Sequence, residues 1–186
     1  MGNSKQPNIK PKCICRTMGA KLLIIVSIGV FFLTACLPQK AISPTPQPEL
    51  SIVYLFTAET TFDKIEVKQG KLSYTYFEDV NNKCAQWIYQ SPCWTEQDLQ
   101  AKEASLSNSD INDLITLVLQ TKFMELANSY GNAPPGQRYY PYSLKVKLGE
   151  VEKEVIYQSF PDAQPMPEAM EKLIDRLHEL VKEKIQ

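Results

Sequence analysis

Apolar and polar residues alternate in four short stretches of the chain: 64–68, 72–76, 140–148 and 151–157. A strand with one buried and one solvated face shows this period of two. Gln69-Gly70 separates the first two stretches and Gly149-Glu150 the last two, and glycine at such a break is typical of a hairpin turn. With the β-rich run Ser51–Phe56, the pattern predicts up to five strands, most of them paired as hairpins.

Two other stretches repeat their apolar residues at helical spacing. The first covers 111–119 and follows Ser109, which we expect to be the N-cap, with Asp110 in the first turn. The second covers 170–185 and follows Pro167, which we expect in the first turn. Two amphipathic helices need an apolar surface to pack on, and half-buried hairpins supply one. We therefore predict an α+β fold in the order ββ-loop-α-ββ-α, with two helices on one face of an antiparallel sheet of four to five strands.

The N-terminal segment is basic and then apolar. Five lysine or arginine residues and no acid precede Cys36, and the run Leu22–Leu37 carries no charge. A spanning helix needs about 20 apolar residues, so this run of 16 is short for a membrane anchor. A basic region, an apolar region and a small-residue cleavage site, in that order, indicate an export signal.

Leu33-Thr34-Ala35-Cys36 ends the apolar run and resembles the lipobox of bacterial lipoproteins. The resemblance implies a diacylglyceryl group on the thiol of Cys36, cleavage just before this residue, and frequent acylation of the new amino terminus. Residues 1–35 would then be a signal peptide. A start at Met18 gives a more compact signal, in which case Cys13 and Cys15 are never made. The alternatives are an uncleaved membrane anchor and a chance cysteine that follows an ordinary export signal.

Cleavage changes the charge balance of the chain. The full sequence has 20 basic and 21 acidic residues, and the part from Cys36 onward keeps 15 and 21, a net charge of −6. A surface of that sign repels nucleic-acid phosphates and anionic lipid headgroups, so nucleic acid is disfavoured as a partner. We expect contact with the lipid bilayer to come from acylated Cys36. Residues 36–49 are proline-rich and predict an extended tether that reaches up to roughly 40 Å. Residues 50–186 have the size of a single globular domain.

Cys84 and Cys93 are the two cysteines left after the lipidated position. Export places them where a disulfide persists, and their spacing is not that of a redox CxxC motif. The expected pairing is a structural disulfide, with free thiols as the alternative.

Known catalytic patterns are missing from the sequence. A structural zinc site needs four ligands, which these two cysteines and the single histidine, His178, do not supply, and no GxSxG or phosphate-binding loop occurs. His178 lies at the edge of the last apolar stripe, where we expect a surface histidine. We assign no catalytic residue, no metal ligand and no cofactor.

Two aromatic segments are candidate contact sites. Trp87 and Trp94 lie in or beside the segment between the two cysteines, and Tyr139, Tyr140 and Tyr142 follow the loop 133–137. Aromatic side chains in rigid loops are frequent binding hot spots, and they also make ordinary cores. The sequence leaves both interpretations open, with Trp94 and Tyr139 expected to be the more exposed.

The leading hypothesis is a lipid-anchored domain on the extracytoplasmic face of the cell membrane, without catalytic activity, that binds an envelope protein or a glycan. One alternative is a cell-envelope hydrolase whose site is assembled only in the folded chain. Another is a purely structural envelope lipoprotein.

Overall fold

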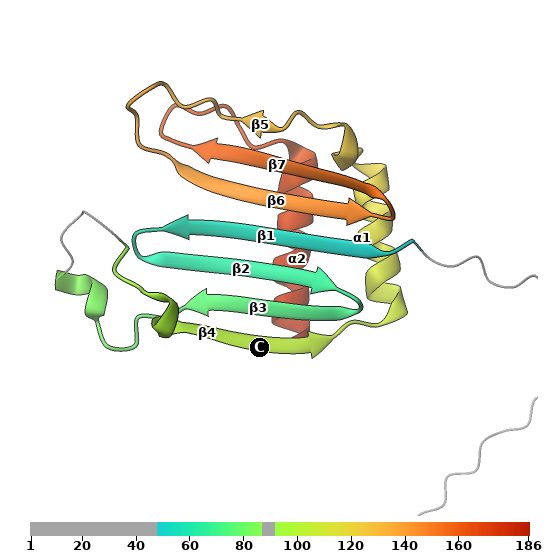
Figure 1. Ribbon diagram of the computed structural model, residues 1–186, viewed down its shortest axis with the longest axis horizontal. Coiled ribbons are helices and arrows are strands. Elements are labelled where there is room, and N and C mark those ends of the chain that lie inside the picture. The colour runs from blue at the N-terminus through green and yellow to red at the C-terminus, as the bar shows by residue number, and fades with distance from the viewer. Residues whose placement is uncertain (1–47, 87–91) are drawn as a thin grey trace, which may run out of the picture. The chain divides into compact units, whose positions relative to one another are not determined.

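The computed structural model describes residues 48–86 and 92–186. They form one seven-stranded sheet in the order β4-β3-β2-β1-β6-β7-β5, with both helices behind the same face (Figure 1). The strands are β1 (Leu50–Ala58), β2 (Thr61–Lys68), β3 (Lys71–Phe77), β4 (Leu99–Ser105), β5 (Ser129–Tyr130), β6 (Tyr140–Leu148) and β7 (Val151–Ser159). The helices are α1 (Asn108–Gln120) and α2 (Glu168–Lys184). The predicted α+β class is confirmed, but the sheet is larger than the four to five strands expected.

The predicted hairpins are present. Lys68 pairs with Lys71 across the turn at Gln69-Gly70, and Leu148 pairs with Val151 across the turn at Gly149-Glu150. The central pairing joins β1 to β6, two strands about 90 residues apart in sequence. Local alternation therefore predicted the hairpins, while the joining of the two halves depends on long-range contacts.

Two strands were missed, for different reasons. β4 is an edge strand with mostly exposed side chains, so its sequence LQAKEAS has no apolar alternation. β5 has only two residues and pairs parallel to β7, which makes the sheet mixed rather than purely antiparallel. Neither strand carries the burial pattern on which a period-two prediction depends.

The hydrophobic core lies between the sheet and the two helices. Alternate strand residues point toward the helices, and α2 lays one apolar stripe across them. The fully buried residues of this core include Ile52, Ile65, Val67, Leu72, Leu144, Val146, Leu114, Val118, Leu173, Leu177 and Leu180.

The start of α1 differs from the prediction by two residues. Its N-cap is Ser107, not Ser109. The Ser107 hydroxyl accepts a hydrogen bond from the backbone N–H of Asp110 at 3.2 Å, and the Asp110 carboxylate accepts one from the backbone N–H of Ser107 at 2.8 Å. This reciprocal capping box needs an acceptor three residues after the cap, and Ser107-x-x-Asp110 provides it. Pro167 immediately precedes α2, close to its predicted place.

The two ends of the sheet are covered differently. β1 begins at Leu50 at one end, here called the entry end, and reaches Ala58 at the other, here called the loop end. Figure 1 shows α1 behind the entry end and α2 behind the middle of the sheet. At about 3.4 Å per residue, the two ends of β1 lie roughly 27 Å apart.

Several predictions fall outside the described residues, namely the signal peptide 1–35, Cys36, the tether up to residue 47, and Trp87. In the part of the chain that the structure describes, neither helix is both long enough and apolar enough to cross a bilayer.

Candidate functional site

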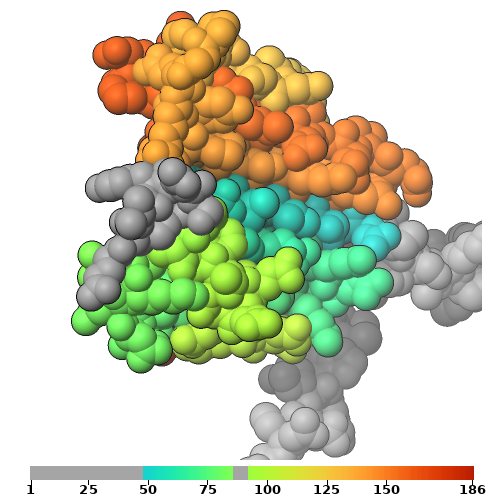
Figure 2. All heavy atoms as spheres, turned by 60° about the vertical axis from the view of Figure 1, so that its left-hand side comes forward, coloured from blue at the N-terminus to red at the C-terminus, as the bar shows by residue number. Residues whose placement is uncertain are grey.

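Three segments meet at the loop end. They are the turn between β1 and β2, the segment 78–98, here called the disulfide loop, and the segment 131–139, here called the Tyr-Pro loop. Figure 2, which turns this end toward the viewer, shows the described part of the disulfide loop (green) below the central strands and the Tyr-Pro loop (orange) above them. We first describe how each loop is held.

A disulfide closes the first of these loops. Cys84 and Cys93 are bonded, as predicted, with their Cα atoms 5.3 Å apart. The Asp79 carboxylate accepts hydrogen bonds from the backbone N–H groups of Lys83 and Cys84 at 2.7 and 3.0 Å. Lys83 also forms an ion pair with Asp98 at 2.5 Å, and this contact, with hydrogen bonds from Thr95, lowers the pKa of Asp98 to about 2. The described part of the loop is therefore held by several polar contacts besides the covalent bond.

Trp94 docks the disulfide loop onto the sheet. Its indole N–H donates to the carbonyl of Ala58 at 3.0 Å, and its ring packs edge to face on Phe62 with centroids 5.0 Å apart. The ring is half-buried. Trp94 is thus a structural contact on one side, with part of its surface left for another molecule.

Glu59 connects both loops to the β1–β2 turn. Its carbonyl accepts the backbone N–H of Cys93 at 2.8 Å, and its carboxylate forms an ion pair with Arg138 of the Tyr-Pro loop. The Arg138 guanidinium also lies 5.8 Å from the centroid of the Tyr140 ring. Neighbouring Tyr139 is 41% exposed. The fold therefore brings the two predicted contact segments to one end of the molecule.

Tyr142 belongs to the helix side of the sheet rather than to the loop. Its ring stacks on Phe56 with centroids 4.3 Å apart, and both rings are half-buried. On the far side of Phe56, β2 contributes Asp63, and β3 contributes Tyr76, whose ring stacks on Tyr74 at 4.8 Å. A row of aromatic rings that includes one carboxylate thus crosses the loop end of the sheet.

Asp63 pairs with His178 of α2. Its Oδ2 lies 2.8 Å from His178 Nε2, and His178 Nδ1 lies 3.0 Å from the carbonyl oxygen of Ile174. A carbonyl oxygen and a carboxylate both accept hydrogen bonds, so the doubly protonated ring of His178 would satisfy both partners. The hydrogen bond from Asp63 raises the pKa of His178, against the opposing effect of burial. This half-buried pair replaces the plain surface histidine that we expected.

The two hydrogen-bonded contacts of His178 limit its use as a catalytic base. In a serine hydrolase one imidazole nitrogen is held by an acid and the other receives the proton of the nucleophile. In the present structure the second nitrogen of His178 faces a main-chain carbonyl instead. The His178–Asp63 pair therefore has no nitrogen with which to activate a serine in this conformation.

Tyr54 completes the surroundings of Asp63. Its ring packs edge to face on His178 at 5.3 Å, and burial first, then the charge of Asp63, raise the pKa of the Tyr54 hydroxyl. The second oxygen of Asp63, Oδ1, is buried, and a hydrogen bond between Asp63 and the Tyr54 hydroxyl adds to the rise in the pKa of Tyr54. One signal for this group was available in the sequence, because Asp63 occupies the inward-facing register of Ile65 and Val67, where a carboxylate is unusual.

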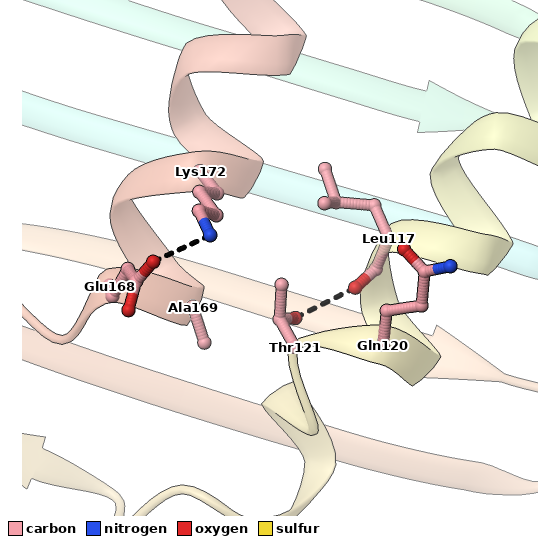
Figure 3. A pocket seen from close by; sticks show the side chains of 6 residues that line it. All are labelled: Leu117, Gln120, Thr121, Glu168, Ala169 and Lys172. Carbon is pink, nitrogen blue, oxygen red and sulfur yellow. Dashed lines mark hydrogen bonds and ion pairs between the residues drawn. The ribbon is translucent and has the colours of Figure 1, made fainter.

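A small hollow also separates the end of α1 from the start of α2 (Figure 3). Three of its polar side chains are bonded locally: Thr121 donates to the Leu117 carbonyl at 2.7 Å, and Glu168 pairs with Lys172 at 2.5 Å. The described residues hold no cluster of three or more side chains suited to a metal ion. The loop end is therefore the better candidate.

Comparison of the chain with protein-family models and with curated proteins gives no match.

Proposed function

We propose that this chain is a lipoprotein anchored in the cell membrane through Cys36, and that its domain is a non-catalytic binding module on the extracytoplasmic face. The anchor rests on the basic segment, the apolar run and the lipobox Leu33–Cys36. Its partner is an envelope protein or a glycan, and the contact surface is the loop end, with Trp94, Arg138, Tyr139 and Tyr140.

The observation that carries this proposal is the position of Glu59 relative to the entry of the chain. Glu59 joins both aromatic loops, and β1 separates that junction from Leu50, where the tether enters, by roughly 27 Å. A module tethered at the entry end would present the loop end away from its attachment point. An exposed tyrosine, a half-buried tryptophan and an arginine at one end of the molecule have the composition of a binding hot spot.

The competing functions predict other geometries. A hydrolase needs an available base near a nucleophile, and both nitrogens of His178 are engaged. A purely structural lipoprotein needs no specific contact surface, so the tests below are designed to separate it from a binding module.

The anchor is tested by the intact mass of the protein extracted from its native membrane with detergent, without reductant. We expect the mass of residues 36–186 plus a diacylglyceryl group, less two hydrogens for the disulfide, with further mass if the new amino terminus is acylated. Cys36→Ala should abolish both cleavage and lipid attachment. A mass that retains residues 1–35 would establish the uncleaved anchor instead.

The contact surface is tested by placing a photo-crosslinking amino acid at Tyr139 in intact cells. Val151 is the matched control, because it is 60% exposed but lies at the entry end. We expect a discrete cross-linked product from position 139 and none from position 151. Equal products at both positions, or none at 139, would favour the structural lipoprotein.

A further inference from the structure

A hollow of about 470 Å³, here called the lysine hollow, lies at the entry end on the face of the sheet turned away from the helices. In Figure 1 this open face is toward the viewer. The floor of the hollow is β1, where Ser51 and Val53 alternate with buried Ile52. Lys68 of β2 and Lys147 of β6 both lie opposite Ser51 in the ladder. Two long side chains thus flank a short one, and the difference in length leaves a trough between them.

Two of the lysines in the lysine hollow are not neutralised by the protein. The Lys145 ammonium lies 2.8 Å from the carboxylate of Glu152, but Lys68 and Lys147 form no ion pair with any other described residue. Three lysines and two glutamates line the hollow, which gives it a net charge of +1. The hollow is therefore positive, whereas the chain from Cys36 onward has a net charge of −6.

The loop end has the opposite charge. Residues 78–98 contain four acids and one lysine, a net charge of −3, and the ion pair of Glu59 with Arg138 changes nothing in that balance. At the entry end, Lys71 and Glu150 of the two neighbouring turns cancel each other, so the charge around the lysine hollow stays at +1. A negatively charged surface would therefore attract the entry end and repel the loop end.

We propose that the lysine hollow binds the phosphate of an anionic lipid headgroup in the bilayer that holds the lipid anchor. This contact rests on the proposed function, because the anchor on Cys36 keeps the entry end near the membrane. Glu49, the last residue of the tether, itself lines the hollow. The ammonium groups of Lys68 and Lys147 and the hydroxyl of Ser51 donate to the phosphate oxygens. The attraction acts only close to the surface, since it falls off within a Debye length. Bound in this way, the domain keeps its loop end pointing away from the membrane.

The test uses the full lipidated chain, purified in detergent and inserted into nanodiscs of two compositions. One disc contains phosphatidylcholine and phosphatidylglycerol in equal parts, and the other contains phosphatidylcholine alone. A photo-crosslinking amino acid replaces Gln69, which lines the lysine hollow, or Val80, which is 68% exposed in the disulfide loop and is the matched control. At position 69 we expect lipid adducts in the anionic disc and roughly tenfold fewer in the neutral disc. Equal yields at position 69 in both discs, or equal yields at positions 69 and 80, would overturn the proposal.

Charge variants identify the lysines responsible. The double variant Lys68→Gln with Lys147→Gln should lower the adducts at position 69 in the anionic disc roughly tenfold, to the level of the neutral disc. The control is Lys122→Gln with Lys182→Gln, which removes the same charge from exposed positions after α1 and in α2. The control should leave the adducts unchanged. An equal loss in both double variants would mean that only the net charge matters, which contradicts a site in the lysine hollow.

The lipid anchor and the lysine hollow are tested separately. A chain whose intact mass lacks the lipid would reject the proposed function, and the headgroup contact with it. A chain that carries the lipid and stays with the discs, but gives no adduct at position 69 in the anionic disc, would reject the headgroup contact alone. Cross-linking at Tyr139 tests the loop end independently, because that position lies at the other end of the sheet.

Discussion

The entry end and the loop end of the sheet are built from the same strands but from different chemistry. Behind the entry end and the middle, the inward positions are aliphatic, such as Ile52, Val67 and Val146, and the helices bury them completely. At the loop end the inward positions are Phe56, Asp63, Tyr76 and Tyr142; α2 reaches this row through His178, which bonds Asp63, while the three rings stay half-buried.

If the proposed function holds, this difference separates the part of the fold that provides stability from the part that binds a partner. Completely buried aliphatic side chains contribute most of the hydrophobic free energy of folding. Half-buried aromatic and charged groups contribute less of that free energy and keep part of their surface for another molecule. The following predictions test this division, from the largest expected effect to the smallest.

The largest effect should come from the core under α2. Leu177→Ala removes a side chain that is 0% exposed and should lower the free energy of unfolding by about 2–5 kcal/mol. Tyr76→Ala at the loop end is the comparison, with an expected loss of about 1 kcal/mol, because its ring is already partly solvated. Chemical denaturation measures both. A loss for Tyr76→Ala as large as that for Leu177→Ala would mean that the loop end belongs to the core.

The next effect concerns the disulfide loop. Cys84→Ser should lower the free energy of unfolding by about 2–3 kcal/mol in the chain-entropy model. The wild type should lose a similar amount when a reductant is added, whereas the variant should not respond to it. Thermal melting with and without reductant provides the comparison. An unchanged melting curve for Cys84→Ser under oxidising conditions would show that the bond adds no stability.

A smaller effect is expected in the Tyr-Pro loop. Gly131 has φ +86°, and a Cβ atom there would come within 2.1 Å of the Gln158 carbonyl oxygen on β7. Gly131→Ala should therefore lower the free energy of unfolding by roughly 1–3 kcal/mol.

Gly136 in the same loop is the matched control for Gly131. It has φ +82° and no atom within 4 Å of an added Cβ, so alanine there adds only the backbone strain. The two variants are compared by thermal melting. Equal losses at both positions would mean that backbone strain, and not the close approach to β7, causes the loss of stability at Gly131.

These regions also differ in how far the sequence predicted them. Alternation in 64–68, 72–76 and 140–148 predicted the strands and the face that points inward, because burial on one face leaves that period. The helical stripes predicted α1 and α2. Exposed β4 and the two-residue β5 left no such pattern, so the sheet was predicted too small.

The site was harder to predict than the fold. The aromatic loops were found from composition and the disulfide from cysteine count, but their junction at Glu59 depends on contacts between distant segments. Asp63 and His178 are 115 residues apart, and no local pattern relates them. Alternation shows which side chains point inward, and it does not show where along the strands the helices stop covering them.

The smallest effect concerns the Asp63–His178 pair and depends on pH. The pKa of His178 is raised in the folded state, so the pair stabilises the fold fully below the unfolded value near 6.5, and the stabilisation is lost as the pH rises through the raised folded value. Asp98 and Asp110 have lowered pKa values and act in the opposite window, since their contribution is lost only in acid. Denaturation midpoints from about pH 5.5 to about pH 9 should therefore fall with pH in the wild type and fall less in His178→Gln. Parallel profiles for the two proteins would show that the pair does not link folding to the charge of the histidine.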